Sequence, residues 1–114
     1  MNELDLDSRV LAEIPRGKDK ARKSREIALR LGLHAPMSEW DCPLIRQSVR
    51  RLREHHLIAS GPYGYYKPVT EDEVKSGRHN IVSRIRGLAE TLNLYDRSAA
   101  DLTRQFLGQL RLLD

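Results

Sequence analysis

The side chains best suited to chemistry in this sequence are guanidinium and amide groups on one helical segment, residues 41–56. At about 100° per residue, Gln47 and Arg50 point away from the apolar positions, with Arg51 beside them and Arg46 on the flank. Arginine forms bidentate hydrogen bonds with guanine, and glutamine with adenine. This face predicts contact with base edges in the major groove of double-stranded DNA. The alternative is an arginine face that meets only solvent.

Further cations lie on both sides of this segment. One group falls in residues 15–23, which read as an exposed basic loop, and consists of Lys18, Lys20, Arg22 and Lys23. Neutralising phosphates supplies most of the sequence-independent affinity for DNA, so we expect these side chains to bind phosphate. The alternative is a flexible loop without specific contacts. In the stretch "SGPYGYYKP", residues 60–68, Tyr63 and Lys67 are the expected backbone contacts. Tyr65 and Tyr66 alternate faces, so one of them should pack against the helices.

The positive charge is confined to the first part of the chain. Residues 16–53 carry 11 Lys and Arg against 4 Asp and Glu, a net charge of +7, whereas residues 71–114 carry 7 of each. A local excess of this size favours a polyanion as the partner there. The neutral second part favours a protein partner.

Other functions find little support in the sequence. The four histidines, His34, His55, His56 and His79, have no zinc-ligand spacing, and no catalytic triad pattern or phosphate-binding glycine loop occurs. We therefore expect no enzymatic activity, metal, cofactor or small-molecule ligand. Cys42 is the only cysteine and is interpreted as a passive small residue, which excludes an internal disulfide and favours a cytoplasmic location. No signal peptide or membrane span is expected.

Local signals predict three short helices in the first half, near residues 7–14, 24–31 and 41–56. Asp7, Ser24 and Asp41 are the expected N-caps, and Gly32 is the expected stop of the second helix. With Asp41 as the cap, Pro43 falls in the first turn of the third helix, where its missing N–H has no cost.

The second half begins with a hairpin and continues as helix. "LIAS" and "YYK" flank "GPYG", which predicts two short strands and a turn. Thr70 and Glu73 form a capping box that opens a long helix. A second box at Ser98 and Asp101 predicts a break and a separate terminal helix. The fold class is thus mostly α, an α+β arrangement of three short helices and a hairpin followed by a long helix and a terminal helix, with domains at 7–69 and 70–114.

The long helix carries an apolar seam with heptad spacing. Val74, Ile81, Ile85, Leu88, Leu92 and Tyr95 are separated by 7, 4, 3, 4 and 3 residues, and Arg78 fills the remaining seam position. The predicted terminal helix adds Leu102, Phe106, Leu110 and Leu113. We expect a homodimer through these helices, at Ile81, Ile85, Leu88, Leu92, Leu102, Phe106 and Leu110. The alternative is that the seam folds back as core. Gly77 predicts a bend or close packing near the start of the helix.

The motifs "REIALRLGL" and "IRQSVRRLREHHLIASGPYGYYKP" resemble the winged helix-turn-helix at the N-terminus of biotin-protein-ligase-type repressors. "IPRGKDKA" and "GYYKP" are similar to motifs of small phage and prophage winged-helix proteins. The resemblance covers about residues 10–95. It departs from the phage pattern at Lys20, where asparagine is usual, and in the segment from Ser98 onward. It implies a winged helix that binds DNA.

These observations predict sequence-specific binding of double-stranded DNA by a dimeric, phage-like transcriptional regulator. One alternative is a phage replication or DNA-packaging accessory protein, such as a small terminase-like protein or replisome organiser. Another is a winged helix that serves only as a protein-interaction module.

Overall fold

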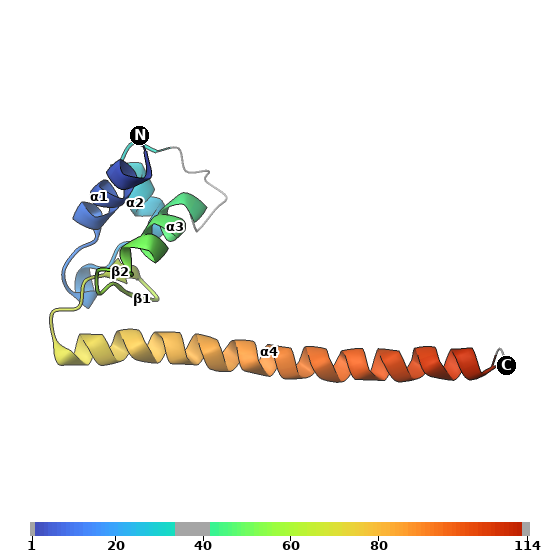
Figure 1. The fold of residues 1–114 in the computed structure, drawn as a ribbon. Helices are drawn as coiled ribbons and strands as arrows, with labels where there is room; N and C mark the ends of the chain where they lie inside the picture. Colours follow the sequence, from blue (N-terminus) through green and yellow to red (C-terminus); the bar gives the residue numbers. More distant parts are fainter. Residues whose placement is uncertain (1, 34–41, 113–114) are drawn as a thin grey trace. The chain divides into compact units, whose positions relative to one another are not determined.

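The computed structural model describes residues 2–33 and 42–112, with the backbone alone at 106–107 and 109–112. Within these ranges the chain is mostly helical, with four α-helices and one antiparallel hairpin (Figure 1). The elements are α1 (Glu3–Glu13), the 3₁₀ turn η1 (Lys18–Lys20), α2 (Ser24–Arg30), α3 (Pro43–Leu52), β1 (Ala59–Gly61), β2 (Gly64–Tyr66) and α4 (Glu71–Leu112). The chain divides into two compact units, Met1–Asn80 and Ile81–Asp114.

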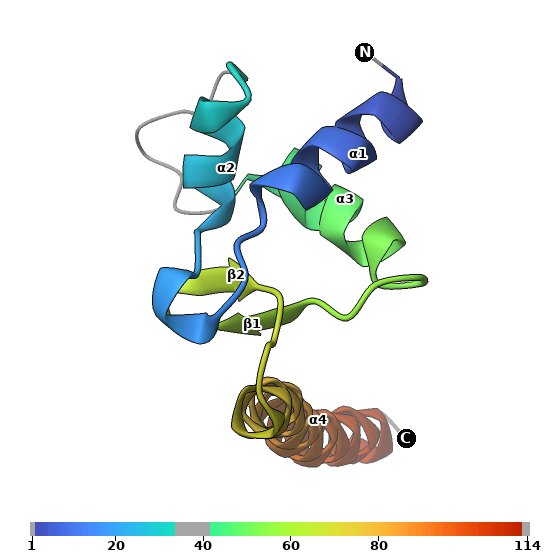
Figure 2. The ribbon, with the colours of Figure 1, turned by 90° about the vertical axis from the view of Figure 1, so that its left-hand side faces the viewer.

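The first unit is built on one apolar core between α1, α2 and α3. Figure 2 shows these helices side by side, with the hairpin next to them. The buried residues are Leu6, Val10 and Ile14 from α1 and its end, Ile27 and Ala28 from α2, Ile45, Val49 and Leu52 from α3, and Ile58 before β1. Helices α1 and α3 contribute positions three or four apart, as expected for an amphipathic helix with one buried stripe, whereas α2 contributes two adjacent residues.

The first helix begins earlier than the sequence predicts, and Asp7 is not its N-cap. Asn2 occupies the cap position, and its Oδ1 accepts a hydrogen bond of 2.9 Å from the backbone N–H of Asp5. Asp7 instead lies inside the helix, where its carboxylate bonds to Ser48 and Arg51. The prediction failed because these partners lie more than 40 residues away in the sequence.

The caps of the next two helices also differ from those predicted. Ser24 is the first residue of α2 instead of its cap, and its buried hydroxyl accepts a hydrogen bond of 2.9 Å from the N–H of Cys42. Cys42 holds the cap position of α3, so the prediction of Asp41 as cap is wrong; Asp41 itself lies outside the described residues. Two other predictions are confirmed: Pro43 begins α3, and Gly32 follows α2 with a φ of 73°.

The third helix is shorter than predicted, because α3 ends at Leu52 and residues 53–55 form a turn. The chain then enters the predicted hairpin, in which Gly61 pairs with Gly64 across a two-residue turn. Tyr66 is buried and donates to the carbonyl of Glu73 at 3.4 Å, and half-buried Tyr65 packs against the core, so both rings pack and not one alone as predicted.

The segment 15–23 exposes most of its side chains, as predicted, but it is not a free loop, because its backbone pairs with the hairpin. Arg22 and Tyr65 exchange backbone hydrogen bonds of 3.0 and 2.7 Å, and Gly17 N–H donates to the carbonyl of Lys67 at 2.9 Å. The segment therefore pairs with the outer side of β2 over the bridges Arg16–Lys67 and Arg22–Tyr65. Gly64, at a φ of 116°, permits this approach, since a Cβ there would lie 2.2 Å from the carbonyl of Arg22.

The capping box at Thr70 and Glu73 is confirmed at the start of α4. The Glu73 N–H donates to Thr70 Oγ1 at 3.2 Å, and the Glu73 carboxylate accepts from the N–H of Val69 at 2.8 Å. Gly77 marks close packing, because a Cβ at this position would lie 2.8 Å from the Cβ of Ala59 in β1. The first turns of α4 thus pack against the hairpin.

The predicted break at Ser98 does not occur, and α4 continues from Glu71 to Leu112 as one helix of 42 residues. Thr103 Oγ1 donates to the carbonyl of Ala99 at 2.9 Å, a bond from residue i to i−4 just after the predicted boundary. The capping box predicted at Ser98 requires a non-helical residue before the first turn, and Ala99 and Ala100 favour helix instead. There is therefore no separate terminal helix. None of the helices in the described part of the chain has the length and apolar character needed to cross a membrane.

Candidate nucleic-acid interface

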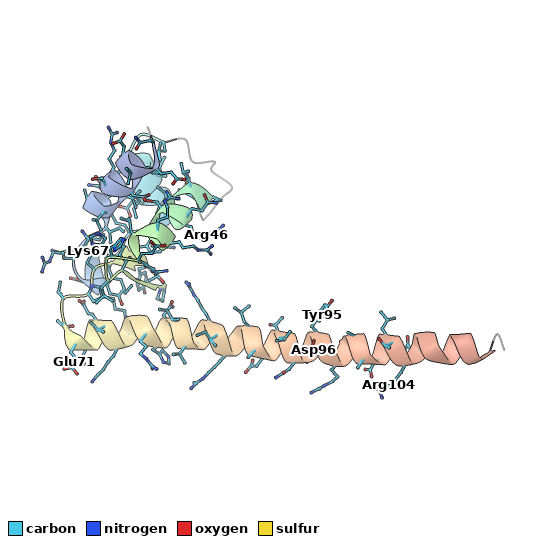
Figure 3. The ribbon with its side chains drawn as sticks, in the orientation of Figure 1. Arg46, Lys67, Glu71, Tyr95, Asp96 and Arg104 are labelled. Atoms are coloured by element: carbon cyan, nitrogen blue, oxygen red, sulfur yellow. The ribbon has the colours of Figure 1, made fainter. Side chains whose placement is uncertain are left out.

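The face of α3 that the sequence singles out is solvent-exposed at three of its four predicted contact residues. Arg46, Gln47 and Arg50 are exposed, whereas Ile45 and Val49 are completely or almost completely buried. The buried pair fixes the rotation of the helix about its axis, so the polar side chains have to face outward. Figure 3 shows Arg46 extending from α3 away from the core of the first unit.

Arg51, the fourth predicted contact on α3, makes an internal ion pair. Its Nη2 lies 2.7 Å from Asp7 Oδ1 and its Nε lies 3.0 Å from Asp7 Oδ2, and Ser48 Oγ donates to Oδ1 at 2.6 Å. The Arg51 hydrogen bonds lower the pKa of the Asp7 carboxyl below its ordinary value, and the Asp7 contact in turn raises the pKa of Arg51. This bidentate pair joins α1 to α3 and holds the exposed face in place.

Two other predicted DNA contacts bind the carboxyl-terminal end of α1. Lys67 Nζ donates to the carbonyl of Leu11 at 2.8 Å, and Arg22 Nη1 donates to the carbonyl of Glu13 at 2.8 Å. The last carbonyls of a helix lack partners within the helix, and cations there also meet the negative end of its dipole. Arg22 and Arg30 both pair with the Glu13 carboxylate, at 3.0 and 2.8 Å.

The remaining cations of the 18–23 segment are exposed, and the first of them is held by α4. Lys18 Nζ donates to Ser76 Oγ at 2.7 Å, and its backbone N–H donates to Glu73 Oε2 at 2.7 Å. These backbone donors, Lys18 first and then Val69, lower the pKa of the Glu73 carboxyl. Lys20 and Lys23 are also exposed. The segment is therefore fixed in position and still presents positive charge to solvent.

The hairpin turn presents Tyr63, whose side chain is 71% exposed. The turn is short and carries proline at position 62, so Tyr63 has a fixed point of attachment. At the other end of the hairpin, Arg53 lies 5.9 Å from the centre of the Tyr65 ring and donates from Nε to the carbonyl of Ile58 at 3.1 Å. Arg53 thus connects the end of α3 to the hairpin.

Arg16 is an exposed cation of this region that the sequence interpretation did not select. It pairs through its backbone with Lys67, at the end of the hairpin. Its position directly after Pro15, at the start of the basic run, was the available signal. Only the pairing with Lys67 places Arg16 beside the hairpin.

The described residues form an open hollow of moderate volume that a small ligand could enter. An open hollow of about 260 Å³ lies between α1, α3 and Leu33, and includes Gln47 and Arg51 in its lining. Within residues 2–33 and 42–112, no group of three or more His, Cys, Asp and Glu side chains could hold a metal ion.

The predicted dimerisation residues of α4 are exposed wherever the structure describes their side chains. These are Ile81, Ile85, Leu88, Leu92 and Leu102, with exposed fractions from 46 to 71%. The side chains of Phe106 and Leu110 lie outside the described part. Tyr95 and Arg104 point to opposite sides of α4 in Figure 3, so the apolar seam and a polar side face different directions.

Comparisons of this chain with protein-family models, with curated proteins and with solved structures found no match.

Proposed function

We propose that the first unit is a winged helix-turn-helix domain that binds double-stranded DNA, and that the protein acts as a transcriptional regulator and not as an enzyme. The order of three helices and a hairpin supports this proposal, as does the pairing of the 15–23 segment with β2. The observation that carries it is the exposure of Arg46, Gln47 and Arg50 on α3, above buried Ile45 and Val49.

In this proposal α3 enters the major groove. Arg46, Gln47 and Arg50 contact base edges, where a bidentate pair contributes about 1–3 kcal/mol of discrimination against a wrong base. Helix α1 and the Asp7–Arg51 pair hold α3 in its orientation. Arg51, Arg22 and Lys67 therefore act mainly by positioning other groups.

The hairpin and the 15–23 segment, which pair with each other, contact the DNA backbone beside the groove. Lys18, Lys20 and Lys23 supply charge for phosphates, and Tyr63 supplies a hydroxyl and a ring at the hairpin turn. Arg16 joins this group because its backbone pairs with the end of the hairpin. Contacts of this kind set affinity and register but do not read sequence.

The test is selection from a randomised duplex pool at about 150 mM salt, where non-specific binding is typically weak, at about 10⁻⁴–10⁻⁶ M. We expect an enriched motif, and fluorescence anisotropy then compares two variants on it. Arg50→Ala should relax preference at one base pair, at a cost of about 1–3 kcal/mol. Lys20→Ala should weaken all duplexes alike and reduce the slope of log K against log salt by about one.

The matched control is Arg97→Ala, which removes the same charge from an exposed position in the second unit. It should leave both the motif and the salt slope unchanged. Equal effects of Arg50→Ala and Lys20→Ala would contradict the division into base and phosphate contacts. If no sequence is enriched while binding persists at low salt, the protein is a backbone binder, as a replication or packaging role requires. Loss of all binding at low salt would leave the protein-interaction module.

A further inference from the structure

The second unit exposes a continuous apolar seam along α4. Since the helix does not break at Ser98, the heptad spacing of Ile81 to Tyr95 continues through Ala99 to Leu102. Six large apolar side chains of the seam are between 46 and 71% exposed. Most of the stability of helices in proteins comes from packing an apolar face, so a helix of this length and pattern requires a partner along the seam.

We propose that the seam pairs with the same seam of a second copy of this chain as an antiparallel coiled coil centred between residues 93 and 94. In this arrangement the two helices run in opposite directions. The steps of 3 and 4 residues that alternate along each seam then match, so that seam residues of the two copies meet in layers. Its layers pair Ile85 with the partner's Leu102, Leu88 with the partner's Ala99, and Leu92 with the partner's Tyr95. Each layer occurs twice by the two-fold symmetry.

The sizes of the seam residues favour this direction. In an antiparallel pair, the small side chain of Ala99 lies opposite Leu88, so each such layer combines a large and a small residue. In a parallel pair every seam residue meets its own copy, and two Ala99 side chains would leave an underfilled layer. A parallel pair would also bring two Arg78 side chains together in the seam, with a like-charge penalty.

The seam also sets the register. A shift of one heptad toward the start of the helix would place Arg78 opposite Leu102 of the partner subunit, which buries a guanidinium group against an apolar side chain. The proposed register keeps all six layers between residues 85 and 102 apolar, because it leaves Arg78 outside this stretch.

The positions beside the seam bring no like charges together in this arrangement. Arg84 faces Gln105 of the partner subunit, and Asp96 faces the partner's Ala89.

Disulfide trapping distinguishes the two directions in the full chain. In a Cys42→Ser background, one preparation carries Leu88→Cys and another carries Ala99→Cys. The antiparallel pairing brings Cys at 88 close to Cys at 99 of the other copy, whereas like positions are too far apart to bridge. In a glutathione redox buffer, we expect the mixture to form interchain disulfide at least about tenfold more than either preparation alone.

Every outcome bears on the proposal. Efficient linkage within the Ala99→Cys preparation alone would establish a parallel pair and overturn it. Sedimentation equilibrium of the reduced proteins should give twice the monomer mass of 13.1 kDa. A monomer at about 100 µM, or a ring of more copies, would also overturn it. Because Leu88→Cys removes seam volume, Ile85→Cys mixed with Leu102→Cys repeats the test on a second layer.

Discussion

The two units of the chain differ in whether their large apolar side chains are buried or exposed. In residues 2–80 nine apolar side chains, from α1 and its end, α2, α3 and the residue before β1, form one buried cluster. In residues 81–112 the described large apolar side chains are at least 46% exposed, apart from Val82, which is half-buried. The first unit thus buries its apolar side chains within one chain, whereas the seam of the second unit stays exposed, a pattern typical of interaction surfaces.

Charged side chains show the same contrast. In the first unit Asp7, Glu13 and Glu73 each bind groups that lie far away in the sequence, and so they connect separate elements. In the second unit the one ion pair recorded among the described side chains joins Asp101 to Arg104, three residues apart on one helix. Local pairs of this kind contribute only about 0.2–0.5 kcal/mol each.

The largest expected effect is a loss of dimerisation through the second unit that leaves the stability of the first unit unchanged. Leu92→Glu places a carboxylate in two layers of the proposed pair and should raise the dimer dissociation constant at least about a hundredfold. The first unit should keep its thermal unfolding midpoint, because its core contains no residue of the seam. Sedimentation equilibrium measures the first effect, and melting of the first unit's near-ultraviolet signal measures the second.

The chain supplies a matched control for this change. Leu94 is 60% exposed, against 58% for Leu92, but lies outside the heptad seam. Leu94→Glu should leave dimerisation nearly unchanged. If both variants dissociate the dimer equally, the seam is not the interface. If Leu92→Glu also melts the first unit, the two units do not fold independently.

The difference between local and long-range contacts explains which features the sequence could predict. The apolar spacing of Ile45, Val49 and Leu52, the hairpin and the Thr70–Glu73 box depend on residues within a few positions of each other, and the structure confirms them. The prediction of Asp7 as a cap failed for the opposite reason. An aspartate near a helix start satisfies the local rule, but its partners on α3 could not be read from neighbouring residues.

The prediction of the candidate site also succeeded for local features and failed for long-range contacts. Exposure of Arg46, Gln47 and Arg50 follows from the helical period alone, since these positions alternate with buried ones. The internal roles of Arg51, Arg22 and Lys67 depend on Asp7, Glu13 and the end of α1, which the period does not reveal. Composition identified a basic region correctly without showing which cations hold the fold together.

A smaller effect tests the long-range pair in the first unit. Asp7→Asn keeps the shape of the side chain but removes the charge that binds Arg51, and should lower the free energy of unfolding by about 1.5–3 kcal/mol at pH 7. Because the folded pKa of Asp7 is lowered from 3.8, the stabilisation is present above about pH 4 and is lost as the pH falls through the folded value. Urea unfolding across this range measures both quantities.

Asp5→Asn is the control for the Asp7 change, since Asp5 is exposed on the same helix and its carboxylate has no recorded partner among the described residues. It should change stability little. The Asp7→Asn protein should show a flatter dependence of stability on acid pH than the unmodified chain. An unchanged acid profile would mean that the Asp7–Arg51 pair does not contribute to folding in solution.

The smallest effect concerns Glu73, which joins the basic segment to the start of α4. Its carboxylate accepts from Lys18 N–H and Val69 N–H at 2.7 and 2.8 Å. Glu73→Gln weakens both bonds, because a neutral amide oxygen is a poorer acceptor than a carboxylate. Amide hydrogen exchange at Lys18 should become about two- to fivefold faster, while the melting midpoint changes little. Glu71→Gln is the matched control, since the exposed Glu71 pairs with Lys75 on the same helix.

The pH dependence of that exchange sharpens the comparison between the units. Since the pKa of Glu73 is lowered by the hydrogen bonds it accepts, protection at Lys18 should persist above the ordinary glutamate value of 4.5 and decline as the pH falls through the lowered value. Amides of residues 84–102 should not follow this transition, because their protection depends on pairing of the seam and hence on protein concentration. If exchange at Lys18 and at residues 84–102 becomes faster together in acid, Glu73 stabilises more than the basic segment. The two units would then unfold in one cooperative transition.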